Sequence, residues 1–339
     1  MKKNILLLLA IFLASVASYA QQATATLNHN DTITTFYGID ALVEAHNSAA
    51  PGDVITLSSG QFTAPTITKD NLTIIGAGMD GDAIRMEPDT SKWVLPTILV
   101  GDFKFGVTGN NFGGSITLKN LVINELNLQT SRIGYNNPSI IAERCFFKSY
   151  LVSTGYGVIA RVSYTLYNCS GSFGEVKRIN AVNSYIRLGD YAANCQEGIY
   201  TNCIVKLDSS AEANCDISNS TLSNCIVFKG GATKTFSNGV LCQNTLYIGD
   251  ETDAFSGVTA VNCWSATDSN IFKEGTYYEL IEEIAQKYLG TDGTEIGMYG
   301  GAHPFSPTPI GPRITRCDVA PKTTPDGKLS VHIEVGTAQ

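Results

Sequence analysis

The chain has 339 residues, of which 16% are charged and 43% hydrophobic, and it contains 32 glycines. This composition excludes a disordered chain and a collagen-like chain, and the length is sufficient for a large hydrophobic core. The formal net charge is -8. We therefore expect no nucleic-acid partner, because a phosphate backbone repels an acidic surface.

The first 20 residues have the pattern of a secretory signal peptide. Two lysines precede an apolar run over residues 5–14, and Ser18-Tyr-Ala20 fits the small-residue rule for cleavage. We expect cleavage after Ala20, which leaves a net charge of -10. No later segment approaches the roughly 18 apolar residues of a transmembrane helix. The sequence thus predicts a secreted or periplasmic protein with no membrane span.

An Asn-Cys pair recurs through the central part of the chain. The asparagines of these pairs are residues 168, 194, 202, 214, 224 and 262, and similar runs place Asn120, Arg144, Asn183 and Asn244 in the same position. The repeating units contain short runs rich in Ile, Val, Phe and Tyr, with no space for a helix. This repeat predicts a parallel β-solenoid in which each unit is one rung, stacked about 4.8 Å from the next.

Stacking of the rungs accounts for both residues of the pair. Asparagines at the same turn can hydrogen-bond amide to amide in a ladder, and cysteine suits the interior as a small apolar side chain. We expect most of the nine cysteines to be free and buried, because a disulfide also requires a particular torsion. No Cys-x-x-Cys motif is present, so we expect no metal site. A β-sandwich is disfavoured because tight-turn dipeptides are sparse between residues 115 and 270.

Residues 38–60 predict an amphipathic helix near residue 45, a Pro-Gly-Asp turn and a first strand. Such a helix would cover the open end of a solenoid. This segment, together with Asn71-Leu-Thr-Ile-Ile-Gly-Ala-Gly78, resembles the opening of right-handed parallel β-helix proteins of the pectin-lyase-like superfamily. The stretch Asp292-Gly-Thr-Glu-Ile-Gly-Met-Tyr-Gly-Gly-Ala-His-Pro-Phe305 resembles the end of secreted Bacteroidetes β-helix proteins of unknown function. The resemblance implies a right-handed parallel β-helix. Together with the repeat, it leads us to expect an all-β, right-handed parallel β-helix of roughly ten rungs.

The expected domain order follows from these features. It consists of a signal peptide (1–20), an N-terminal extension (21–35), the β-helix (36–305) and a C-terminal extension (306–339). Residues 277–289 have apolar side chains at helical spacing and are followed by Gly290, which predicts a short helix. Residues 313–319 and 328–335 predict a β-hairpin. We expect a monomer.

Tyrosine and arginine are concentrated in residues 131–200, which hold 8 of the 15 tyrosines and 5 of the 8 arginines. Tyrosine rings stack on sugar rings, and arginine binds carboxylate or sulfate groups bidentately. We expect carbohydrate binding here, in particular of an acidic polysaccharide. The alternative is that about half of the tyrosines point into the core and the arginines are solvated. The candidate carbohydrate-binding residues are Arg144, Lys148, Tyr150, Arg161, Tyr164, Arg187 and Tyr191.

The resemblance also implies enzymes, among them polysaccharide lyases, and a lyase acting by β-elimination on a uronate polymer is the alternative function. No histidine lies between residues 47 and 302, so Lys148, Arg161 or Tyr164 would be the base and Arg187 the carboxylate ligand. We expect no cofactor unless a lyase uses calcium. A structural or adhesive surface protein is a second alternative. The candidate calcium ligands are Asp208, Glu212 and Asp216, or Asp250, Glu251 and Asp253.

Overall fold

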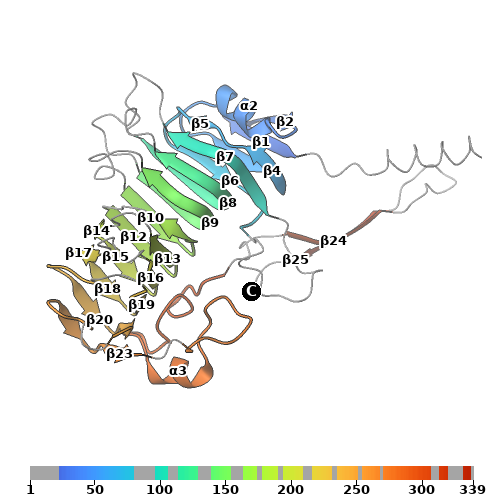
Figure 1. Cartoon of the computed structure of the whole chain (residues 1–339). Helices are drawn as coiled ribbons and strands as arrows, with labels where there is room; N and C mark the ends of the chain where they lie inside the picture. Colours follow the sequence, from blue (N-terminus) through green and yellow to red (C-terminus); the bar gives the residue numbers. More distant parts are fainter. Residues whose placement is uncertain are drawn as a thin grey trace, which may run out of the picture.

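The computed structural model of the chain describes most of the sequence after residue 22, and the signal peptide expected at residues 1–20 lies outside it. Within the described part the protein is an all-β parallel solenoid with two short helices (Figure 1). None of the helices described is long and apolar enough to cross a membrane. The described residues are 23–79, 96–105, 114–128, 139–153, 163–173, 178–189, 194–208, 216–230, 235–250, 254–267, 270–306, 313–319 and 331–336.

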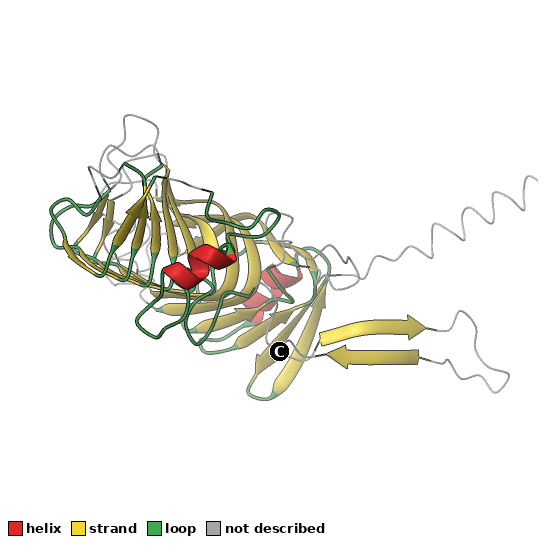
Figure 2. Cartoon of the chain, turned by 90° about the horizontal axis from the view of Figure 1, so that it is seen from below, coloured by secondary structure: helices red, strands yellow, loops and turns green. Residues whose placement is uncertain are grey.

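One side of the solenoid, which we call face A, is a continuous ladder of parallel strands. In Figure 2 the strands of successive rungs lie side by side along the stack. The ladder runs through β3 (Val54–Leu57), β6 (Leu72–Ile75), the first part of β8 (Ser115–Leu128) and of β9 (Ser139–Ser153), β10 (Ser163–Tyr167), β12 (Arg178–Val182), β15 (Ile199–Thr201), β18 (Thr221–Ser223), β20 (Leu241–Gln243) and β22 (Thr259–Val261).

A second parallel ladder, face B, follows the corner at the end of each face A strand. The strands β14 (Asn194–Gln196) and β17 (Asp216–Ser218) pair in parallel on a third side of the solenoid. Face B contains β4 (Gly60–Thr63), β5 (Thr66–Ile67), β7 (Thr97–Phe105), the last parts of β8 and β9, β11 (Ser170–Phe173), β13 (Tyr185–Gly189), β16 (Ile204–Asp208), β19 (Ile226–Phe228), β21 (Leu246–Ile248) and β23 (Trp264–Ala266).

The corner between faces A and B explains the asparagine repeat. Every corner residue has a left-handed backbone conformation, with φ between 45° and 58°. After glycine, asparagine is one of the residues that tolerate this conformation best. Arg144 occupies the same position in its rung, as the repeat predicts. The corner residues are Asn71, Asn120, Arg144, Asn168, Asn183, Asn202, Asn224, Asn244 and Asn262.

From the corner at Arg144 onward, the residue after the corner is a cysteine, serine or threonine that donates to a backbone carbonyl. Cys169 Sγ lies 3.4 Å from the carbonyl oxygen of Ala142 in the preceding rung, and Thr245 Oγ1 lies 3.3 Å from that of Leu222. Cysteine, serine and threonine are therefore equivalent here as small side chains with one donor. The expectation of free thiols is confirmed for Cys145, Cys169, Cys203, Cys225 and Cys242, which are buried, and for the half-buried Cys263.

The regular part of the solenoid is shorter than the sequence predicts. About six turns have the regular form, against the roughly ten expected, and they begin at β10 with two short strands and one corner residue. The earlier rungs differ because β8 and β9 pass through the corner as single long strands. Their side chains nevertheless continue one core, in which Ile140, Leu166, Tyr200 and Leu222 are buried.

The N-terminal end of the core is capped by a hairpin and a helix. The predicted helix is confirmed as α2 (Ala41–Ser48), which buries Ala41, Leu42 and Ala45. The expected N-terminal extension contains β1 (Thr24–His29) and β2 (Thr32–Tyr37), with β1 antiparallel to β3. Their turn is Asn30-Asp31, with both φ angles positive. Such turns usually contain glycine, and asparagine and aspartate are the residues that can replace it. Because the usual glycine is missing here, the hairpin is harder to predict from the sequence.

Residues 270–306, which we call the strap, run back along the corner instead of forming another rung. Asn244 Nδ2 donates to Leu289 O at 2.9 Å, and Asn168 Oδ1 accepts from Ser306 N at 2.9 Å. The amides of Asn183 and Asn224 also bond to the strap, so at these corners contacts with the strap take the place of the amide ladder expected from the sequence. The strap also buries the outward side chains Ile204, Ile226 and Leu246 of face B.

The strap contains less helix than the sequence predicts. The helix expected over residues 277–289 is limited to α3 (Glu282–Lys287), because Leu280 instead bridges to Phe272. Tyr278 has a φ of 61° and stacks on Tyr185 with the ring centroids 4.6 Å apart. The predicted C-terminal hairpin is confirmed as antiparallel β24 (Arg313–Val319) and β25 (Val331–Gly336).

Candidate functional site

The predicted carbohydrate-binding residues occupy different environments. Tyr164 is 3% exposed and belongs to the core, which corrects its assignment as a surface ligand or base. It alternates inward between two outward residues of β10. Lys148 is exposed and Arg187 is half-buried. Arg161, Tyr191 and the side chain of Tyr150 lie outside the described residues.

Arg144 is part of an ion-pair network at the corner of its rung. It is 6% exposed, and its Nη1 lies 2.7 Å from Glu143 Oε1. Glu143 Oε2 lies 2.8 Å from Lys119 Nζ. Burial alone would raise the pKa of Glu143, but the two cations outweigh it and hold the pKa below its ordinary value. Arg144 is therefore neutralised within the protein and is less suited to bind a ligand carboxylate than the sequence suggests.

Face B is irregular at the rungs of β7, β8 and β9, where β-bulges occur. Two residues of β7 lie between the pairs Leu99↔Ile123 and Asp102↔Glu125, opposite Asn124 alone. Gly101, one of the two, has a φ of 83°, a conformation that favours glycine. A second irregularity separates β8 from the end of β9. Bulges redirect side chains and often lie beside functional sites.

A hollow of about 470 Å³ opens at the bulges, lined by Gly101, Asn124, Glu125 and Lys148. We call it the bulge pocket. The Oδ1 atom of Asn124 is buried and has no hydrogen-bond partner in the structure. A buried carbonyl oxygen without a donor costs about 1–3 kcal/mol, so a ligand that donated a hydrogen bond to it would gain stability.

Two carboxyl groups lie next to each other at the edge of the pocket. Asp102 and Glu125 are register partners on adjacent strands, and Lys104 Nζ lies 3.0 Å from Asp102 Oδ2. Burial, followed by the charge and hydrogen bond of Asp102, raises the pKa of Glu125, while Lys104 opposes the rise. The pair therefore retains a proton more readily than an isolated carboxylate, and it offers both donors and acceptors to a hydroxyl-rich ligand.

Basic side chains continue from the pocket along face B. Lys148 lies in the bulge opposite Ser172, Ser172 pairs with Arg187, and Arg187 pairs with Lys206. Arg187 points outward because its neighbours Ile186 and Leu188 are buried, and Lys206 does so for the same reason between Val205 and Leu207. We call Lys148, Arg187 and Lys206 the basic row. At one rung per 4.8 Å it spans roughly 14 Å.

The structure thus brings together two predicted residues, Lys148 and Arg187, and adds groups that the sequence did not indicate. Gly101, Asn124, Glu125 and Lys206 were not predicted as site residues. A glycine inside a strand pattern is a signal for a bulge, so Gly101 was the position from which the pocket could have been suspected. Lys206 carried no such signal, because only the strand register places it beside Arg187.

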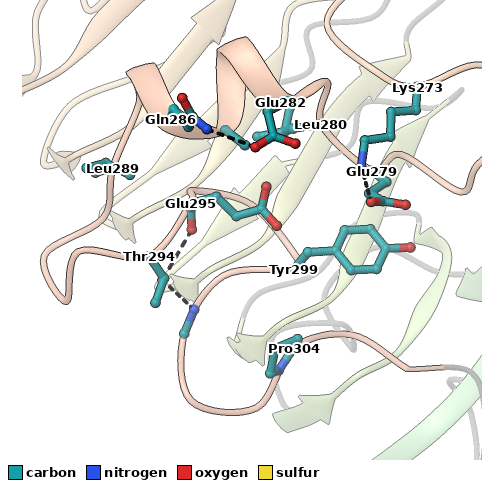
Figure 3. Close-up of a pocket in the computed structure, with 12 residues that line it drawn as sticks. Lys273, Glu279, Leu280, Glu282, Gln286, Leu289, Thr294, Glu295, Tyr299 and Pro304 are labelled. Atoms are coloured by element: carbon teal, nitrogen blue, oxygen red, sulfur yellow. Dashed lines mark hydrogen bonds and ion pairs between the residues drawn. The ribbon is translucent and has the colours of Figure 1, made fainter.

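A second hollow, of about 480 Å³, lies in the strap between α3 and the residues around Tyr299. In Figure 3 the carboxylates of Glu279, Glu282 and Glu295 surround it. Lys273 is hydrogen-bonded to Glu279. Burial, and then the charge of Glu279, raises the pKa of Glu295, while Lys273 lowers it. This acidic hollow repels an anionic ligand, so an acidic polysaccharide is better matched by the basic row.

In the part of the chain that the structure describes, no cluster of three or more His, Cys, Asp or Glu side chains is arranged to hold a metal ion. Of the calcium ligands considered from the sequence, Glu212, Glu251 and Asp253 lie outside the described residues.

Comparison of the chain with protein-family models, curated proteins and solved structures finds no match. The class of the protein, an all-β parallel solenoid, therefore follows from its own strand pairing.

Proposed function

We propose that this solenoid is an exported protein that binds an acidic polysaccharide through the basic row and the adjoining bulge pocket. The observation that carries the proposal is the alignment of Lys148, Arg187 and Lys206 along one outward row of face B, in which Ser172 lies between Lys148 and Arg187. The chain as a whole has a formal charge of -8, so a row of cations is a local exception. Such a row suits a polymer with repeated carboxylate or sulfate groups.

The bulge pocket supplies groups of a second kind for the same ligand. Asn124 offers a buried acceptor without a partner, and Asp102 and Glu125 can accept from sugar hydroxyls. A charged row gives attraction along the chain, whereas directed hydrogen bonds give orientation to one sugar unit. The resemblance of residues 36–305 to pectin-lyase-like β-helix proteins supports the same class of ligand.

Affinity measurements on a panel of polysaccharides test the proposal. We expect the protein to bind uronate or sulfated polymers, and Lys148→Ala and Arg187→Ala to reduce the affinity about tenfold each, the effect of roughly 1.4 kcal/mol. Lys287→Ala is the matched control, because Lys287 lies on α3. Added salt should weaken binding because exposed charges are screened. Unchanged affinity in both row variants, or equal loss in the control, would contradict the proposal.

The lyase alternative uses the same residues. β-Elimination requires a cation for the uronate carboxylate and a base for the neighbouring proton. Arg187 and Lys148 supply these residue types in the same row, two rungs apart. Ultraviolet absorbance of unsaturated uronate ends, followed during incubation with each polymer, separates the two functions. A rise that Lys148→Ala abolishes supports a lyase, and a flat trace with retained binding supports a binding protein.

A further inference from the structure

Face A carries two outward rows of residues without charges over the regular rungs. In β10, β12, β15, β18 and β20 the two row residues flank one buried residue, which is Leu166, Ala181, Tyr200, Leu222 or Cys242, and the aligned residues of β22 continue both rows. No residue of the two rows is charged, in a chain of formal charge -8. Arg178, at the start of β12, lies beside the rows and pairs with Glu197 at 3.4 Å. The first row consists of Thr165, Asn180, Ile199, Thr221, Leu241 and Thr259, and the second of Tyr167, Val182, Thr201, Ser223, Gln243 and Val261.

Large apolar side chains in these rows remain open to solvent. Ile199 is 52% exposed, Val261 45%, Tyr167 42% and Leu241 39%. Single exposed apolar residues are common, but a group of them on one face indicates a contact surface.

Face B shows what the protein does with a comparable surface. Its outward residues Ile204, Ile226 and Leu246 are at most 1% exposed, because the strap covers them. The chain therefore covers one apolar outward row with its own residues and leaves the other uncovered.

The side chains between the apolar groups are hydroxyls and amides. They recur with the rung spacing of about 4.8 Å, so donors and acceptors alternate with apolar surface along the solenoid axis. A pyranose ring has the same division, with C–H groups on its faces and hydroxyls at its edge. The uncharged rows also offer nothing to neutralise a carboxylate, a phosphate or an ammonium group. The matching partner is therefore an uncharged polymer of sugars.

We infer that face A, from β10 to β22, is a binding surface for a neutral polysaccharide. This surface is separate from the basic row, which lies on face B. The charge-free rows begin after Lys119, Glu143 and Arg144, whose ion pairs occupy the corner and the face A strands of the preceding rungs. The inference does not depend on the proposed binding of an acidic polymer.

Retention on insoluble neutral polysaccharides tests the inference. The full protein is incubated with microcrystalline cellulose and with chitin, and the bound fraction is measured at low and at high salt. We expect binding that salt does not weaken, because the two rows carry no charge. Ile199→Lys and Leu241→Lys should each lower the affinity at least tenfold. Both side chains are exposed, so the substitutions should leave the fold intact, which circular dichroism checks.

Ile33→Lys is the matched control, since Ile33 is also exposed but lies on β2. Lys148→Ala should leave neutral-polymer binding unchanged, so failure of this inference is distinguishable from failure of the proposed function. Absence of binding to every neutral polymer, or equal binding by the wild type and Leu241→Lys, would overturn the inference. A dimer in light scattering that Ile199→Lys dissociates would also overturn the inference, because face A would then be an interface between two copies of the chain.

Discussion

The side-chain amide of Asn183 donates to the carbonyl oxygen of Met298, 115 residues later in the chain, at 2.9 Å. The same nitrogen lies 2.6 Å from the carbonyl oxygen of Gly300. The corner asparagine therefore has two roles: its backbone makes the left-handed turn between the faces, and its side chain holds the strap. Asn224 repeats the arrangement by accepting from Thr291 N at 3.0 Å.

Removal of this amide should loosen the strap. We expect Asn183→Gly, which preserves the left-handed corner, to lower the free energy of unfolding by about 1–3 kcal/mol because two buried carbonyl groups lose a donor. Asn120→Gly makes the same backbone change at a corner of an earlier rung and is the control. Urea denaturation measures both. Equal losses in the two variants would mean that the amide contacts contribute nothing.

The stacked thiols should react slowly in the folded protein. Burial, followed by the neighbouring thiol of Cys169, raises the pKa of Cys145 well above its ordinary value, and burial with Cys225 does the same for Cys203. A raised pKa leaves less thiolate, which is the reactive form. Labelling with a thiol reagent near pH 8, followed by mass spectrometry, should modify Cys263 before Cys145 and Cys203, because Cys263 is half-buried and the other two are buried. Labelling of Cys203 in the folded protein at the rate of Cys263 would refute this prediction.

The hydrogen bond between His29 and Asp53 should make stability depend on pH. Their atoms Nδ1 and Oδ1 are 2.8 Å apart, and Asp53 Oδ2 accepts from Ala50 N at 2.7 Å. Burial alone would raise the pKa of Asp53, but the hydrogen bonds from Ala50 and His29 outweigh it and leave the pKa lowered. A lowered carboxyl pKa stabilises the folded state above the unfolded pKa of about 3.9, and this stabilisation is lost as pH falls through the folded pKa.

We therefore expect Asp53→Asn to lower the free energy of unfolding by roughly 1 kcal/mol near pH 7. The difference from wild type should shrink as the pH falls below about 4, because Asp53 is then protonated in the unfolded chain and increasingly in the folded one. Denaturation series at several pH values measure it, with Asp70→Asn, at an exposed aspartate, as control. A difference that stays constant down to acid pH would contradict the assignment.

Tyr164 should contribute to the stability of the folded protein and not to ligand binding. It is 3% exposed, and burial raises the pKa of its hydroxyl far above the ordinary value, so it is neither a sugar platform nor a base. We expect Tyr164→Ala to cost about 3–5 kcal/mol, as for other large aromatic residues in a core. Tyr167→Ala, at the exposed tyrosine of the same strand, should cost much less. Loss of acidic-polysaccharide affinity in a folded Tyr164→Phe variant would show that this placement is wrong.

The amino-acid sequence by itself determined the fold class and the position of the corners. The Asn repeat predicts one turn in each rung, and the aligned positions 120, 144, 168, 183, 202, 224, 244 and 262 all have a left-handed conformation. The residue after the corner is predicted as small and interior, which the buried thiols confirm. Such features are readable because they are local: backbone conformation and inward or outward alternation depend on a few neighbouring residues.

The tertiary structure decided which residues share a row and what covers them. Lys148, Arg187 and Lys206 are separated by 39 and 19 residues, and only the pairing of strands across loops of unequal length aligns them. The strap over face B likewise depends on contacts between Asn168 and Ser306, which are 138 residues apart. Local patterns specify the shape of a rung, whereas the register between rungs and the path of the strap arise from long-range packing.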